Sequence, residues 1–381
     1  MRILFWSATF WPTIGGVEVI ARKLLPALQR RGHEFTVVTP KSNANSPDED
    51  EYEGIPVYRF SFQNHFTPSA VDYVIGMRRK IDGLKRAFLP DLVHINAVNR
   101  SDFFYLTTSQ TPRLPLLVTL HGQWENQIEP VVEQTLRRAD WVAGCSAAML
   151  DRGRQLVPEI GARSSVVYNG IEMPLLAPEP LPYDPPRIAC LGRLWPEKGM
   201  DLALLAFVSV RDRIPQARLI IAGDGALRAE LQQQAADLGI ASAVDFLGWV
   251  PPENVPALIN TSTIVLVPSR QEALGLVALE AAAMARPIVA TRVGGLPEVV
   301  VHEETGLLAE PENTGALAES MIFLLKNRDA AARMGQAARD RVQRLFSWDR
   351  YVEAYDGLYR TLTVSSPDRS MATHNSGRLT R

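Results

Sequence analysis

Residues 269–285, SRQEALGLVALEAAAMA, place two glutamates, Glu272 and Glu280, in an otherwise almost unbroken apolar run. Burying a carboxylate costs free energy unless a partner offsets its charge, so both positions need an explanation. The run STIVLVP before them predicts a strand that ends at Pro268, and Gly275 predicts the start of a helix. We therefore expect Glu272 on a loop at the carboxyl end of a strand, and Glu280 about a turn and a half into the helix.

A helix that begins at Gly275 presents free backbone N–H groups from Gly275, Leu276 and Val277, and such groups bind phosphate readily. Glu280 could accept hydrogen bonds from a ribose diol, and Glu272 could accept them from sugar hydroxyls. The alternative interpretation is that both are surface glutamates on an amphipathic helix.

The composition indicates a soluble globular protein of two ordinary domains, with 381 residues, 46% of them hydrophobic and 22% charged. A net charge of -2 argues against nucleic acid and against a strongly basic membrane anchor. Cys145 and Cys190 lie far apart without metal-ligand spacing, which argues against a disulfide scaffold and favours a reducing cytosol. The N-terminal sequence predicts no signal peptide, and no run of about twenty apolar residues predicts a membrane-spanning helix.

Short apolar runs alternate with helical patterns in two series. Residues 172–187, between the series, hold six prolines, which is typical of a stiff, extended linker. The first series predicts strands at 3–7, 35–40, 91–96, 116–122, 141–146 and 164–170, with a helix at 17–33. The second predicts strands at 187–193, 217–225, 244–250, 262–270 and 287–295, with helices at 201–213, 226–238 and 271–285.

This alternation predicts an α/β protein of two doubly wound, Rossmann-like domains. We expect an N-terminal domain over residues 1–172 and a C-terminal domain over residues 173–346. A last helical pattern spans 347–362, and the polar, aperiodic residues 363–381 predict a disordered tail. Ligands of open α/β sheets bind outside the carboxyl ends of the strands, so two such domains facing each other predict an interdomain cleft.

Two cations follow the first strand of the second series, in LGRLWPEKGMD (residues 191–201). Arg193 and Lys198 lie in a loop rich in Pro and Gly, at the carboxyl end of that strand. They suit a diphosphate, because a leaving nucleoside diphosphate gains negative charge. The alternative is an ordinary solvated loop.

The glycine-rich turn PTIGGVE lies between the first predicted strand and the first predicted helix. Gly15 and Gly16 allow a backbone to approach a phosphate or an acceptor closely, although the dinucleotide pattern GxGxxG is absent. His121 lies at the end of a predicted strand and is open to a functional or a structural interpretation, whereas His94 lies inside a strand and is interpreted as structural. The sequence contains no HExxH motif and no Cys/His cluster, so no metal site is predicted.

Residues 74–88, VIGMRRKIDGLKRAF, predict an amphipathic helix with a basic face. Such a helix can rest on an anionic membrane surface. The alternative is a core-facing helix whose basic face is solvated. The basic residues are Arg78, Arg79, Lys80, Lys85 and Arg86.

Taken in order, these motifs resemble those of the family-4 retaining glycosyltransferases, which have the GT-B fold. The resemblance covers roughly residues 1–362, and its most specific part is Glu272 and Glu280 with GGLPEVV downstream. Leu274 stands where many relatives carry Phe, a departure that leaves the donor sugar open. The matching stretches are PTIGGVE, VTLHG, VVYNGIE, LGRLWPEKGMDLAL, LIIAGDG, VDFLGWV, VPSRQEALGLVALEAAAMARPIVATRVGGLPEVV and ETGLLAEP.

The resemblance implies roles for individual residues. Arg193 and Lys198 would bind the donor diphosphate, and the last helix would cross back onto the N-terminal domain. Glu272 would hold hydroxyls of the donor sugar, and His121 would contact that sugar near the reacting carbon. The residues implied to be catalytic are His121, Glu272, Arg193 and Lys198. Gly15 and Gly16 would lie on the acceptor side, and Glu280 would bind the ribose of the donor. The residues implied to bind the donor are Gly16, Gly192, Arg193, Lys198, Val250, Glu272, Gly275, Leu276, Val277 and Glu280.

The same resemblance implies transfer of a sugar from a nucleotide-sugar donor to a hydroxyl of a saccharide or glycolipid, with the anomeric configuration retained. A UDP-sugar is the first choice of donor and GDP-mannose the second, with no metal or other cofactor. The expected location is the cytoplasm or the inner face of the membrane, reached through residues 74–88. Two alternatives remain: a GT-B sugar-nucleotide epimerase, and a non-catalytic protein that binds nucleotide sugars.

Overall fold

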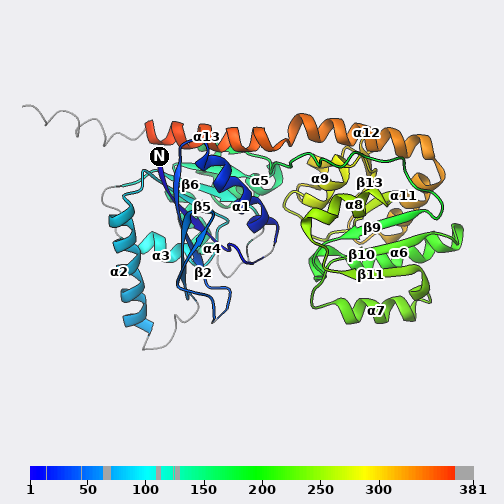
Figure 1. The fold of residues 1–381 in the computed structure, drawn as a ribbon, viewed down its shortest axis with the longest axis horizontal. Helices are drawn as coiled ribbons and strands as arrows, with labels where there is room; N and C mark the ends of the chain where they lie inside the picture. The colour runs from blue at the N-terminus through cyan, green and yellow to red at the C-terminus, as the bar shows by residue number, and fades with distance from the viewer. Residues whose placement is uncertain are drawn as a thin grey trace, which may run out of the picture. The chain divides into compact units, whose positions relative to one another are not determined.

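The computed structural model describes residues 1–13, 15–43, 45–62, 70–108, 113–122, 124 and 129–364, with only the backbone for residues 70–73. The chain forms two compact units, each with its own sheet (Figure 1). The first unit comprises Met1–Cys145, Met149–Val167 and Tyr351–Arg381, and the second comprises Ser146–Ala148 and Tyr168–Arg350.

Within the described residues, the sheet of the first unit has eight strands in the order β3-β4-β2-β1-β5-β6-β7-β8. Neighbouring strands pair in parallel, except that β3 and β4 form an antiparallel hairpin. The strands are β1 (Arg2–Ser7), β2 (Glu34–Pro40), β3 (Glu49–Tyr52), β4 (Ile55–Phe60), β5 (Leu92–Asn96), β6 (Leu116–Leu120), β7 (Trp141–Gly144) and β8 (Ser164–Val166).

The central strands of this sheet are covered on both faces. Every residue of β5 and β6 is buried, and so is every residue of β1 after Arg2. Parallel strands buried on both faces have continuous apolar sequences, which is why the sequence pattern predicts these strands. The helices of this unit are α1 (Gly16–Gln29), α2 (Ala70–Phe88), α3 (Asp102–Thr107), α4 (Glu129–Arg138) and most of α5 (Ala147–Leu156) and α13 (Trp348–Val364), with the 3-10 helix η2 (Pro158–Arg163).

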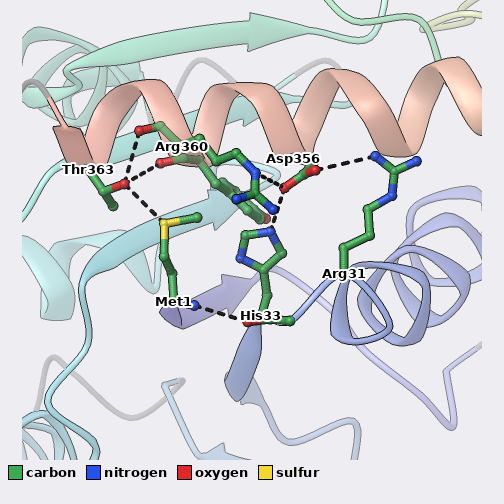
Figure 2. Close-up of polar contacts among 8 residues, drawn as sticks. Met1, Arg31, His33, Asp356, Arg360 and Thr363 are labelled. Atoms are coloured by element: carbon green, nitrogen blue, oxygen red, sulfur yellow. Dashed lines mark hydrogen bonds and ion pairs between the residues drawn. The ribbon is translucent and has the colours of Figure 1, made fainter.

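Helix α13 follows the second unit in the sequence but belongs mostly to the first unit, where it packs near the start of β1 (Figure 1). The hydroxyl of Tyr359 lies 2.7 Å from Nδ1 of His94, and the hydroxyl of Tyr355 lies 3.0 Å from Oγ1 of Thr119. Figure 2 shows a second set of contacts, in which Asp356 of α13 accepts hydrogen bonds from the loop that precedes β2. The predicted helix over 347–362 thus extends to Val364, and residues 365–381 of the predicted tail lie outside the described residues.

The second unit has, within the described residues, a six-stranded parallel sheet in the order β11-β10-β9-β12-β13-β14. Its strands are β9 (Arg187–Leu191), β10 (Arg218–Ala222), β11 (Val244–Gly248), β12 (Ile264–Val267), β13 (Ile288–Thr291) and β14 (Gly306–Ala309). Its helices are α6 (Met200–Arg213), α7 (Arg228–Asp237), α8 (Val255–Asn260), α9 (Leu276–Ala283), α10 (Leu296–Val299), α11 (Thr314–Lys326) and α12 (Arg328–Leu345), with the 3-10 helices η3 (Pro196–Lys198), η4 (Ala241–Ala243) and η5 (Pro252–Asn254).

Each sheet reverses its winding direction at one point. In the second sheet the chain runs outward from β9 to β11 and then returns to β12 on the other side of β9. In the first sheet the corresponding neighbours are β1 and β5. Ligands of doubly wound sheets bind at such switch points, outside the carboxyl ends of the strands. These two places are therefore where the predicted site residues should be sought.

Two predicted helical patterns are longer than the helices that form, for local reasons. The helix predicted over 17–33 ends at Gln29, because the chain turns there and Gly32 takes a φ of 87°. The helical pattern over 271–285 becomes a helix only from Leu276, which agrees with the start predicted at Gly275, because residues 271–275 form a loop and Gly275 takes a φ of 104°. In both cases glycine supplies a left-handed conformation that other residues seldom adopt.

The proline-rich segment 172–187 is held to the second unit by Arg286. Its side chain is fully buried and donates hydrogen bonds to the carbonyl groups of Glu179, Ile259 and Asn260. Burial lowers the pKa of Arg286 to about 10, so the guanidinium stays charged at neutral pH. None of the described helices is both long enough and apolar enough to cross a membrane.

Candidate active site

The loops that follow β9 and β12 meet at the switch point of the second sheet, and each contributes one charged residue to a close pair. Nζ of Lys198 lies 2.7 Å from Oε2 of Glu272, and the hydroxyl of Ser269 donates to the same oxygen at 3.3 Å. The side chains of Lys198 and Glu272 are 22% and 14% exposed, so the pair is largely shielded from water. The carboxylate has the partner that its burial requires.

Arg193 lies on the same β9 loop and is much freer. Its side chain is 59% exposed, and its ion pair with Glu197 is long, at 3.6 Å. Most of the guanidinium donors therefore face solvent. A planar guanidinium with free donors suits bidentate binding of a phosphate group.

Helix α9 begins directly after the Glu272 loop. Its first-turn N–H groups, from Leu276 and Val277, have no acceptor within the helix, and the helix dipole favours an anion at this end. Glu280 lies further along the same helix and is half-buried. The residues predicted for the diphosphate, the sugar and the ribose thus come from two adjacent loops and one helix of a single unit.

Glycines allow these loops to touch. A Cβ at Gly294, where φ is 50°, would lie 1.7 Å from the carbonyl oxygen of Glu272, and one at Gly199, where φ is 64°, would lie 2.1 Å from that of Pro268. The backbone N–H of Gly295 donates to the same Glu272 carbonyl at 3.2 Å. The GGLPEVV stretch therefore supports the Glu272 loop from behind, and glycine is needed there because backbone meets backbone.

The loops after β9, β10 and β11 are joined by backbone hydrogen bonds. The N–H of Gly192 donates to the Ala222 carbonyl at 3.0 Å, and the N–H of Gly223 donates to the Gly248 carbonyl at 2.7 Å. Val250, predicted to bind the donor, is half-buried in the loop that follows β11. The contacts place Gly192 at the switch point, two strands away from the strand that precedes Val250.

In the first unit, His121 follows β6 and takes part in a buried polar chain at the β1–β5 switch point. Its Nε2 lies 2.9 Å from Oδ1 of Asn96, and the Asn96 amide donates to the hydroxyl of Ser7 at 3.3 Å. Because the amide nitrogen serves Ser7, Nε2 of His121 carries the proton and donates to Asn96. Burial lowers the pKa of His121 to about 4, so the ring is neutral at physiological pH.

Gly15 and Gly16 lie at the start of α1, also in the first unit. Gly15 is extended, and a Cβ there would lie 2.5 Å from Oε2 of Glu18, which is buried in the first turn of the helix. Glu18 thus folds back over the glycine turn, as the third residue of a helix does in a capping box. A carboxylate at this position also competes with any phosphate for the end of α1.

His94 is structural, as its place inside a strand predicted. It is fully buried, and its ring nitrogens lie 2.7 Å from the hydroxyl of Tyr359 and 2.8 Å from that of Thr119. Sequence reasoning missed Ser7 and Asn96, although both are polar residues at the ends of predicted apolar strands. That signal could have found them.

Comparison with known proteins agrees with this arrangement. A family model described as glycosyl transferases group 1 matches residues 175–341, and one described as glycosyltransferase family 4 matches residues 14–173. Glycogen synthase of Mycobacterium tuberculosis is 30% identical over 396 residues, which cover 94% of each chain. The chain is a family-4 glycosyltransferase.

This glycosyltransferase is also similar to two further proteins. A GDP-mannose-dependent alpha-(1-6)-phosphatidylinositol monomannoside mannosyltransferase of Mycobacterium tuberculosis is 37% identical over 171 residues, which cover 43% of this chain and 44% of the relative. The structure of a sucrose-phosphate synthase from Thermosynechococcus elongatus is 25% identical, with a TM-score of 0.83 over 96% of this chain and 100% of that one. The predicted GT-B fold is therefore confirmed, and so is the prediction of a glycosyltransferase enzyme.

Proposed function

We propose that this glycosyltransferase moves a sugar from a nucleotide-sugar donor to a hydroxyl of a saccharide or glycolipid, with retention of the anomeric configuration. The observation that carries the proposal is the Lys198–Glu272 pair, 2.7 Å apart, beside the exposed Arg193 at the β9–β12 switch point. It puts cations for a diphosphate next to a carboxylate for sugar hydroxyls.

In this proposal the diphosphate binds to Arg193, Lys198 and the first N–H groups of α9. Glu272 accepts hydrogen bonds from the sugar, and Glu280 accepts them from the ribose. As the bond from the anomeric carbon to the diphosphate oxygen breaks, negative charge grows on the leaving group. The two cations and the helix end stabilise that charge, which is the largest contribution that such a site makes.

The acceptor hydroxyl attacks from the face that the diphosphate leaves, and its proton passes to an oxygen of the leaving phosphate. This sequence of bonds retains the configuration without an enzyme carboxylate as nucleophile. His121, neutral and fixed by Asn96, is assigned to hydrogen bonding with the donor sugar. The acceleration then comes from orientation together with this charge stabilisation.

The donor of first choice is a UDP-sugar and the second is GDP-mannose. The mannosyltransferase relative, which its name describes as GDP-mannose-dependent, supports the second choice. The glycogen synthase relative supports a saccharide acceptor. We further propose a cytoplasmic enzyme that needs no metal ion, with α2 as a contact to the inner face of the membrane.

A thermal-shift panel of UDP, GDP, ADP and their common sugar conjugates tests the proposal. A ligand that binds only the folded protein raises Tm, so we expect a selective rise with one nucleotide. Arg193→Ala should abolish most of that rise. Glu272→Ala should keep much of it but lose turnover, because Glu272 contacts the sugar and not the phosphate.

Other outcomes would contradict the proposal. Equal nucleotide affinity in Arg193→Ala and in the wild type would remove the phosphate assignment. Sugar isomers released without any acceptor would favour a sugar-nucleotide epimerase. Donor binding with neither hydrolysis nor transfer would favour a non-catalytic binding protein.

A further inference from the structure

Arg270 lies two residues before Glu272, and its guanidinium contacts two carboxylates. Nη1 and Nη2 donate to the two oxygens of Asp201, each at 2.7 Å. Nε and Nη2 donate to Glu312 at 2.7 and 3.2 Å. Asp201 belongs to the first turn of α6, and Glu312 lies between β14 and α11. One side chain therefore links the β12 loop to two other segments of the second unit.

The backbone around Arg270 adds contacts to the loop that carries Lys198. The N–H groups of Arg270 and Gln271 donate to the Glu197 carbonyl at 2.8 and 3.2 Å. Nη1 of Arg270 also donates to the Pro196 carbonyl at 3.0 Å. These bonds join the residue before Lys198 to the residue before Glu272. The two loops are therefore joined directly beside the Lys198–Glu272 pair.

The geometry suits positioning better than it suits stability. The side chains of Arg270 and Asp201 are 30% and 32% exposed, and pairs this exposed contribute little free energy. A guanidinium that binds a carboxylate through two parallel hydrogen bonds nevertheless fixes direction as well as distance. Burial tends to raise the pKa of Asp201, but the hydrogen bond and charge of Arg270, together with backbone hydrogen bonds, outweigh burial and hold the pKa below its ordinary value.

We propose that Arg270 is a positioning residue: through Asp201, Glu312 and the Pro196 carbonyl, its side chain holds Lys198 and Glu272 in position for the donor. The catalytic part of this inference rests on the proposed function. Arg270→Gln removes the positive charge and the paired hydrogen bonds to Asp201 while keeping a long polar side chain. Arg270→Lys keeps the positive charge but cannot form the paired hydrogen bonds, so its effects should be intermediate.

Arg218 offers a matched control in the same unit. Its Nε and Nη2 donate to the two oxygens of Asp245 at 3.0 and 2.6 Å, with side chains 36% and 41% exposed. The Arg218–Asp245 pair has the same two parallel hydrogen bonds as the Arg270–Asp201 pair, and its side chains are similarly exposed. Arg218 begins β10, at the amino end of the strand and away from the loops of the site. Arg218→Gln should therefore leave both Lys198 and turnover unchanged.

The first measurement needs no ligand. The protein is treated briefly with an acylating reagent, and the labelling rate of Lys198 is read by peptide mass spectrometry. The Lys198 amine is held against Glu272 at 2.7 Å and its side chain is only 22% exposed, so the reagent reaches it slowly while the pair is intact. We expect Arg270→Gln to raise the rate several-fold, Arg270→Lys to raise it less, and Arg218→Gln to leave it unchanged.

The second measurement separates turnover from binding. Arg270→Gln should lower kcat roughly 10- to 100-fold, because small displacements of reacting groups are costly. The Kd for the nucleoside diphosphate should change little, because Arg193 is intact. A merely structural role would instead lower Tm and reduce binding and turnover together, so Tm is measured for each variant.

Several outcomes would overturn the inference. Unchanged Lys198 labelling in Arg270→Gln would do so, and so would an equal rise in Arg218→Gln. Faster labelling with unchanged kcat would remove the catalytic part. A wild-type protein that binds none of the nucleotides would overturn the proposed function instead, and the Lys198 labelling would still decide the role of Arg270.

Discussion

The ammonium of Lys198 is already engaged by Glu272 at 2.7 Å. A diphosphate that approaches Lys198 therefore shares it with a carboxylate, whereas Arg193, 59% exposed, can turn its donors fully to the phosphate. We infer that Arg193 contributes most of the diphosphate affinity. The Lys198–Glu272 pair then serves mainly to align the sugar with its leaving group, which is why the Arg193 and Glu272 variants are expected to differ.

His121 should make the first unit sensitive to acid. Burial lowers its pKa in the folded protein to about 4 from the ordinary value of 6.5. The part of the free energy of unfolding that depends on a neutral His121 is fully present above pH 6.5. It is lost as the pH falls toward 4, because His121 then binds a proton in the unfolded chain but not in the folded chain. Between pH 7 and pH 5 this loss amounts to about 2 kcal/mol.

His121→Gln tests this, because an amide can keep the hydrogen bond to Asn96 but does not titrate. Chemical denaturation at pH 7 and pH 5 measures the stability lost by each protein. The variant should lose less than the wild type, although some acid sensitivity remains because burial also lowers the pKa of His94. An equal loss in both proteins would contradict the role of His121.

The sequence locates residues that directly follow apolar strands, and it fails for residues whose contacts span the chain. Arg193, Glu272 and His121 each lie at or just beyond the carboxyl end of a predicted strand, so the rule that sites lie at carboxyl ends finds them. The partners of Arg270 are 69 and 42 residues away in the sequence. Only the sheet order brings them together, and no local pattern records it.

At the scale of whole elements, α13 is attached to the first unit by a polar cluster as well as by its tyrosines. Asp356 accepts hydrogen bonds from His33 at 2.8 Å, Arg360 at 2.8 Å and Arg31 at 3.3 Å (Figure 2). Burial tends to raise the pKa of Asp356, but these three donors outweigh it and hold the pKa below its ordinary value. The charged carboxylate is thus the form that binds.

Asp356→Asn should loosen α13 by about 1–3 kcal/mol, because the amide cannot satisfy three charged or polar donors. Hydrogen exchange of the backbone amides of α13 measures this directly, and we expect faster exchange in the variant. Glu353→Gln is the matched control, since Glu353 is exposed on the same helix. Equal exchange rates in Asp356→Asn and Glu353→Gln would show that the cluster does not hold the helix.

Elements were predictable where burial on both faces produces an apolar run. The hairpin of β3 and β4 was not predicted, because β3 has the sequence EDEY and is mostly exposed. Helices α11 and α12 were also missed. In α12 the buried positions are small residues such as Ala331, Gly335 and Ala338, at spacings of three and four. Their helical periodicity is present, but alanine and glycine are weak indicators of a core.

At the scale of the molecule, two doubly wound sheets follow from the alternation of strands and helices, because parallel strands require crossover connections. The sheet order and the similarity to the sucrose-phosphate synthase structure confirm the predicted fold. The sequence does not record the donor base, because the loop after β11 offers mainly backbone and apolar groups. The acceptor and the oligomeric state are likewise encoded by no short motif, and the interdomain cleft stays a prediction.

Helix α2 gives the molecule a basic surface that we propose as its membrane contact. Met77 and Ile81 are buried, so the apolar stripe packs on the core of the first unit. The basic face that remains exposed comprises Arg78, Arg79, Lys80 and Arg86. A basic residue near an anionic surface contributes about 1 kcal/mol, so binding to anionic vesicles should be weak and should fall as salt is raised.

Arg79→Glu combined with Lys80→Glu should abolish co-sedimentation with anionic vesicles, because the change reverses two of the four exposed charges. Arg333→Glu combined with Arg344→Glu, on the exposed face of α12, makes the same change in net charge and should retain binding. Equal losses in the two variants would mean that net charge, and not α2, governs the contact. A wild type that neither sediments with these vesicles nor glycosylates a lipid extract would exclude a glycolipid acceptor and leave the saccharide acceptor.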